Sequence, residues 1–152
     1  MNCEFVAKGK IVIVGIGNPL RGDDGFGPAF IQGIGEKVSY PCIDAGSAPE
    51  NYIGKIIKGE PDTVLIVDAV HLDLAAGEYR FLKKSEILEC GFTTHDLSPH
   101  LFIDFLEKET KADIYLLGIQ PKNLSFGDEM SQPVKKALEE LTGIIVKLLI
   151  LI

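Results

Sequence analysis

Short apolar runs rich in β-branched residues alternate along the chain with segments of helical periodicity. Each run ends in glycine, aspartate or a polar loop, which is typical of a strand covered on both faces. This alternation predicts an α/β fold, a three-layer sandwich in which a twisted, mostly parallel sheet of about five strands has helices on both faces. Strands are expected at 10–17, 39–45, 62–70, 114–119 and, as an edge strand, 78–82. Helices are expected from Gly25 to about residue 38, from a capping box at Ser47, and from Ser98 and Ser131.

Length and composition predict one folded domain over residues 1–152, because 46% of the residues are hydrophobic and 24% are charged. The apolar C-terminal segment 143–152 contains Lys147 and is too short to span a membrane, and the N-terminus lacks the features of a signal peptide. The net charge of −7 disfavours nucleic acid as a partner. The cysteines are Cys3, Cys42 and Cys90, an odd number without C-x-x-C spacing. This argues against a disulfide framework and indicates a reduced, cytoplasmic protein.

Three polar residues are expected along one rim of this sheet. Ligands of open α/β sheets bind beyond the carboxyl ends of the strands, and Asp24, Asp68 and His95 all lie in segments that end strands or precede helices. Two carboxylates and an imidazole suit a divalent first-row metal and leave coordination positions open for substrate and water. The pattern therefore predicts a metal-compatible rim.

Each of these residues also has a structural interpretation. Asp23 and Asp24 precede a helix, where a carboxylate caps free N–H groups and interacts with the helix dipole. Asp68 follows four apolar residues in a buried strand, so it needs either a hydrogen-bonded partner or a cation. His95 stands between threonine and aspartate and fits a hydrogen-bonded loop. The residues alone leave both interpretations open.

Other motifs give little support for a rival site. His100 is expected to lie at the surface or in packing, His71 to support the rim from outside it, and Asp44 to form a turn and a helix cap. The glycines at 15 and 17 are followed at the sixth position by Leu20, which breaks a dinucleotide fingerprint. The chain has neither a Walker A lysine pattern nor a G-x-S-x-G nucleophile elbow, and no cysteine stands in an electropositive loop.

Several segments nevertheless resemble one family, the [NiFe]-hydrogenase maturation endopeptidases. The run 15–27 resembles the family's glycine–asparagine and acidic-pair signature, 65–69 its second acidic motif, and 93–97 its histidine motif. Three further segments are similar to the branch that matures the large subunit of hydrogenase-3-type, formate-hydrogenlyase enzymes: 44–51, 117–121 and 130–134. The matches follow one order along nearly the whole chain, which makes the set specific.

The resemblance implies a metal-dependent protease that removes a short C-terminal extension from the hydrogenase large-subunit precursor after the nickel–iron centre has been inserted. The family's metal-binding and catalytic positions carry over to Asp24, Asp68 and His95. Nickel is then expected to arrive in the substrate, with no organic cofactor, and a monomeric enzyme is favoured. Two alternatives stay open at this point: a nickel-carrier module that uses the same rim without cleavage, and a small-molecule-binding α/β domain.

Overall fold

The computed structural model describes residues 4–87, 91–92 and 99–152. The strands in these residues are β1 (Ile11–Ile16), β2 (Cys42–Gly46), β3 (Thr63–His71), β4 (Tyr79–Lys83), β5 (Gly91–Phe92) and β6 (Asp113–Ile119). The helices are α1 (Phe26–Ile34), α2 (Ile53–Lys58), α3 (Lys84–Ile87), α4 (Pro99–Glu109) and α5 (Gln132–Ile150), with two 3-10 turns, η1 (Gly22–Gly25) and η2 (Pro49–Tyr52).

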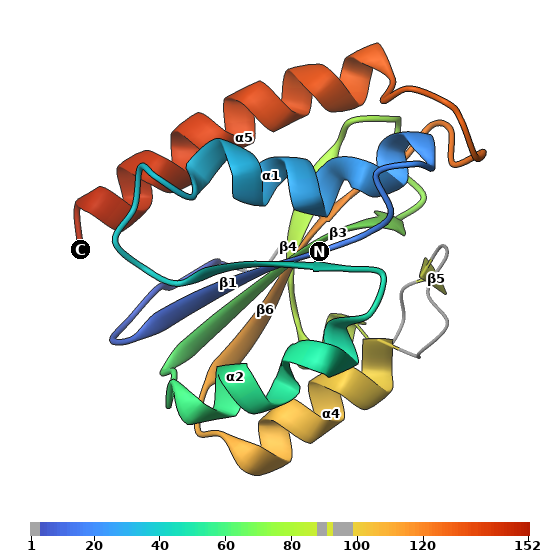
Figure 1. Cartoon of the computed structure of the whole chain (residues 1–152). Coiled ribbons are helices and arrows are strands. Elements are labelled where there is room, and N and C mark those ends of the chain that lie inside the picture. The colour runs from blue at the N-terminus through green and yellow to red at the C-terminus, as the bar shows by residue number, and fades with distance from the viewer. Residues whose placement is uncertain (1–3, 88–90, 93–98) are drawn as a thin grey trace.

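Five strands form a twisted sheet in the order β2-β1-β3-β6-β4 (Figure 1). β1, β2, β3 and β6 are parallel, whereas the edge strand β4 runs antiparallel to β6. The short β5 pairs antiparallel with the end of β3 through Val70 and Phe92, and the sequence analysis did not anticipate it. The mostly parallel sheet of five strands is therefore confirmed.

Two layers of helices cover the sheet, with α1 and α5 on one face and α2 and α4 on the other (Figure 1). Side chains of β1 alternate between the two cores: Ile11 and Ile13 pack in the cluster that contains α1 and α5, and Val12 and Val14 in the opposite cluster. The continuous apolar run of this strand is explained by the burial of both its faces. None of the helices among the described residues has the length and hydropathy needed to cross a membrane.

The expected helix starts are only partly correct. Ser47 was predicted to begin a helix through a capping box, but the first turn begins at Pro49, and Ala48 precedes it without a side-chain hydrogen bond. Ser131 does precede α5, yet its hydroxyl makes no capping bond either, because that hydroxyl is used elsewhere. The helix expected from Gly25 to about residue 38 ends earlier, at Ile34. Ser98 lies outside the described residues.

Candidate active site

Asp24 lies on a constrained turn at the carboxyl end of β1. Gly17 follows the strand with a φ of 147°, and a Cβ atom on this residue would collide with the carbonyl oxygen of Asp24. The backbone N–H of Asn18 donates to Asp24 Oδ2 at 2.9 Å, and the Asp24 side chain is completely buried. The chain therefore holds this carboxylate in one place at the sheet's carboxyl edge.

Asp68 lies on the neighbouring strand at the same edge. The parallel register pairs Val67 with Gly15, so Asp68 stands one residue beyond the last registered pair with β1. Its side chain is completely buried in a strand whose other residues from Thr63 to Val70 are buried too. The turn η1 contacts β3, and a Cβ atom on Gly27 would lie 2.6 Å from the carbonyl oxygen of Val67. Two predicted site residues are thus carried by elements that pack closely together.

The third predicted residue, His95, lies outside the described residues. Among the residues that the structure describes, no three His, Cys, Asp or Glu side chains are grouped so that they could hold a metal. His71, expected to support the rim, is exposed at the end of β3. His100 is half-buried on α4 with Nε2 3.2 Å from the carbonyl oxygen of Ile87, as the packing interpretation predicts.

Asp44 forms the expected turn but caps no helix. It is exposed on β2, and its Oδ1 accepts a hydrogen bond from the backbone N–H of Gly46 at 3.0 Å. The next helical turn is preceded by Ala48 instead.

The predicted capping role of Asp23 is wrong. The residue before α1 is Gly25, and no side-chain cap bond is made there. Asp23 is completely buried and accepts hydrogen bonds from the backbone N–H groups of Lys122 at 2.8 Å and Asn123 at 3.1 Å. Its other oxygen accepts from the N–H of Ser131 at 2.7 Å, and the Ser131 hydroxyl donates to the same carboxylate.

Asp23 therefore joins the turn that carries Asp24 to the segment between β6 and α5. Backbone bonds reinforce this junction: Gly22 N–H donates to Asp128 O at 3.1 Å, and Gly127 N–H donates to Leu20 O at 2.8 Å. Local sequence patterns did not indicate this role, because the partners lie about a hundred residues away from Asp23. One available signal was the presence of two adjacent aspartates where a single cap is enough.

A groove of about 730 Å³ opens beside this junction. Residues of η1 and α1 form one wall of the groove, the segment before α5 forms another, and Asp44 of β2 lies at the edge. The described residues that line the groove are Pro19, Gly22, Gly25, Pro28, Ala29, Ile31, Gln32, Asp44, Asp128, Glu129, Met130 and Lys135. No local sequence pattern indicated this groove, because it is assembled by the packing of separate elements.

Comparison with known proteins defines the class of protein. The family model described as hydrogenase maturation protease matches residues 32–148. The chain is 40% identical over 131 residues to the hydrogenase 3 maturation protease of Escherichia coli K12, a match that covers 84% of this chain and 83% of that relative. The crystal structure of a [NiFe] hydrogenase maturation protease HycI from Thermococcus kodakarensis KOD1 superposes with a TM-score of 0.83 at 35% identity, covering 92% of each chain.

The solution structure of the endopeptidase HycI from Escherichia coli agrees, with a TM-score of 0.82, 36% identity and coverage of 91% of this chain and 90% of that one. The protein is thus a hydrogenase maturation endopeptidase by class. More particularly, the chain belongs to the HycI family of hydrogenase maturation proteases, as the resemblance in the sequence indicated.

Proposed function

We propose that this endopeptidase removes the C-terminal extension of a [NiFe]-hydrogenase large-subunit precursor after the metal centre has been inserted. Nickel is part of that substrate, and Asp24, Asp68 and His95 bind it during cleavage. The matched relatives support this choice of substrate, since one of them is named for the maturation of hydrogenase 3. The same proposal places the protein in the cytoplasm, where thiols stay reduced.

The observation that carries the proposal is the position of Asp68. Asp68 is completely buried on β3, in a stretch where every residue from Thr63 to Val70 is buried. Asp68 lies at the carboxyl edge of the sheet, where ligands of such folds bind. The buried carboxylate of Asp24 is on a turn that packs against the same strand. Carboxylate and imidazole ligands together suit a nickel ion whose remaining ligands are supplied by the precursor.

The chain's own residues then have distinct tasks. Asp24, fixed by the N–H of Asn18, and Asp68, fixed by β3, orient the precursor by binding its nickel ion. Nickel bound there supplies a positive charge that polarises the scissile carbonyl or lowers the pKa of a water molecule. Either Asp24 or Asp68, at a moment when it is not bound to the metal, accepts the proton of the attacking water. Both side chains are completely buried, so a precursor whose nickel ion reaches them reacts in a site shielded from bulk water.

The test is removal of the extension from a purified precursor, followed by mass spectrometry. The nickel-loaded precursor should lose its C-terminal segment when the protein is added, and the metal-free precursor should stay intact. Equal cleavage of the two forms would contradict nickel dependence. Binding of the loaded precursor without loss of the extension would contradict the proteolytic step and favour a carrier role.

A further inference from the structure

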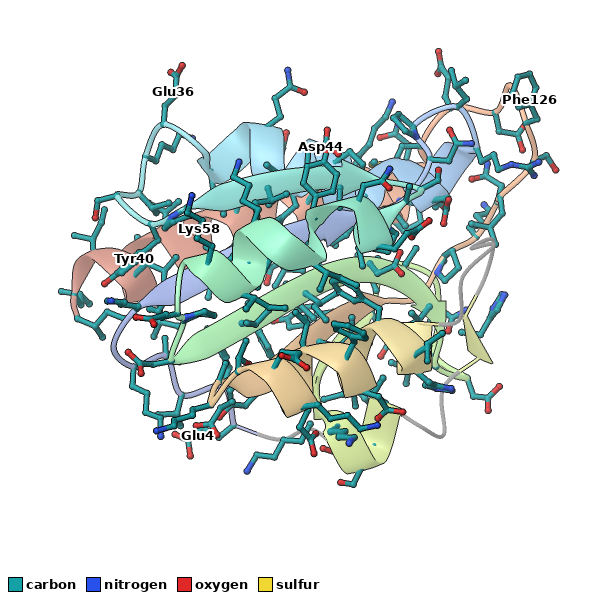
Figure 2. The ribbon with its side chains drawn as sticks, turned by 60° about the horizontal axis from the view of Figure 1, so that its bottom comes forward. Glu4, Glu36, Tyr40, Asp44, Lys58 and Phe126 are labelled. Atoms are coloured by element: carbon teal, nitrogen blue, oxygen red, sulfur yellow. The ribbon has the colours of Figure 1, made fainter. Side chains whose placement is uncertain are left out.

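Two large apolar side chains are exposed on neighbouring loops beside the candidate active site. Leu20, in the loop after β1, is 60% exposed, and Phe126, in the loop after β6, is 70% exposed. The hydrogen bond from Gly127 N–H to Leu20 O, 2.8 Å long, holds the two loops together. Figure 2 shows Phe126 at the outer edge of the molecule, on the opposite side from Glu4. Apolar side chains that are exposed on adjacent loops offer a partner protein apolar area to bury.

The loops that carry this pair are rigidly held. Asp23 receives hydrogen bonds from both ends of the segment that contains Phe126, namely from Lys122 and Asn123 and from Ser131. A surface that is ordered before binding loses little conformational entropy when a partner docks, so its apolar contacts contribute more fully to affinity. Leu20 and Phe126 are therefore presented by a preorganised support.

The groove described above adjoins the same loops. Pro19 and Gly22, on either side of Leu20, line it, and so does Asp128, which follows Gly127. Among the residues that the structure describes, its charged lining consists of three carboxylates, those of Asp44, Asp128 and Glu129, and one ammonium group, that of Lys135. The excess of negative charge is complementary to an extended segment that carries a Lys or Arg side chain.

We propose that the Leu20–Phe126 surface and the adjoining groove form the docking site for the large-subunit precursor. An apolar part of the precursor packs on Leu20 and Phe126, and an extended, positively charged segment of it lies in the groove. The inference rests on the proposed function for the identity of the partner. Leu20 and Asp24 both belong to the segment between β1 and α1, so a precursor docked on Leu20 lies beside the segment that carries Asp24.

Affinity for the nickel-free precursor tests the apolar surface without requiring cleavage. Leu20→Ser combined with Phe126→Ser should raise the Kd at least about tenfold, equivalent to about 1.4 kcal/mol, because the anchors of an interface are lost. Val6→Ser is the matched control: Val6 is 51% exposed, and its segment lies near the amino end of β3, where Lys8 N–H donates to Thr63 Oγ1. The control should leave the Kd unchanged. An unchanged Kd in the double variant, or no binding by the wild type, would overturn the proposal.

Ionic strength tests the groove. The Kd of the wild type should rise with salt, and Asp128→Asn with Glu129→Gln should weaken binding and flatten that dependence. An identical salt dependence in this variant would overturn the assignment of the positively charged segment. The two proposals fail separately. If binding needs Leu20 and Phe126 but no cleavage follows, the proposed function is contradicted. If cleavage depends on nickel but the Leu20/Phe126 variant has an unaltered Kd, the docking site is contradicted.

Discussion

The carboxylate of Asp23 accepts hydrogen bonds from both the backbone N–H and the hydroxyl of Ser131, which lies 108 residues further along the chain. This contact joins the turn after β1 to the residue that precedes α5. Because Asp24 is the next residue, the same contact contributes to holding a candidate nickel ligand in place. The arrangement connects the stability of the fold with the geometry of the candidate site.

Asp23→Asn should lower the free energy of unfolding by about 2 kcal/mol or more. The amide would turn an N–H₂ group toward backbone donors that now bind a carboxylate, and buried donors would lose their acceptor. Urea denaturation measures the effect. Asp128→Asn, the same change on an exposed residue, should alter stability by less than about 0.5 kcal/mol. Equal stability of the two variants would contradict the structural role of Asp23.

Gly17→Ala should both destabilise the protein and displace Asp24. An alanine at this positive φ is strained, and its Cβ would collide with the Asp24 carbonyl oxygen, so a loss of about 2 kcal/mol or more is expected. Gly143→Ala is the matched control, since this glycine lies within α5 with open space around its Cα. The control should stabilise the protein by up to about 1 kcal/mol, because alanine favours helix. Thermal melts of both variants compare the two glycines, and a harmless Gly17→Ala would show that the turn is not constrained.

Cysteine should take no part in cleavage. Cys42 is half-buried, and burial raises the pKa of its thiol, so little reactive thiolate forms near neutral pH. Alkylation of Cys42 by iodoacetamide at pH 7, followed by mass spectrometry, should be slower than that of free cysteine. The combined replacement of Cys3, Cys42 and Cys90 by alanine should keep specific cleavage. A folded triple variant without activity would point to a cysteine nucleophile.

The isolated protein should bind Ni²⁺ weakly. Two carboxylates and one histidine leave the coordination sphere incomplete, and Asp24 and Asp68 are buried before the metal arrives. An imidazole must be unprotonated to bind, so affinity should fall as the pH drops through about 6.5, where histidine ordinarily titrates. Calorimetry at several pH values measures this. An affinity that does not change in His95→Ala would remove His95 from the site.

The sequence predicted the layers of the fold because the longer strands and helices have recognisable local patterns. β3 is apolar on both faces, and α5 repeats its apolar residues at helical spacing, so both could be located without tertiary information. The rule that ligands bind at the carboxyl ends of strands then directed attention to Asp24 and Asp68, and the structure places both at that edge.

Features made by distant segments could not be predicted in this way. Asp23 and Ser131 both have the residue types of helix caps, and only the folded chain shows that they bind each other instead. The groove likewise depends on the packing of α1 beside the segment that contains Glu129. The local pattern at Ser47 was misleading for a related reason, because capping spacing does not fix where the turn begins.

The central claim is that Asp68 serves nickel-dependent cleavage, and Asp68→Asn tests it most directly. Asparagine keeps the size of the side chain and one carbonyl oxygen but removes the charge that attracts a cation. We predict that removal of the C-terminal extension from the nickel-loaded precursor collapses in this variant, while its melting temperature stays close to that of the wild type because asparagine fills the same volume. If Asp68 is only a structural acceptor, the variant should lose roughly 1–3 kcal/mol of stability and lose activity only in proportion. A stable Asp68→Asn protein with full cleavage activity would contradict the account.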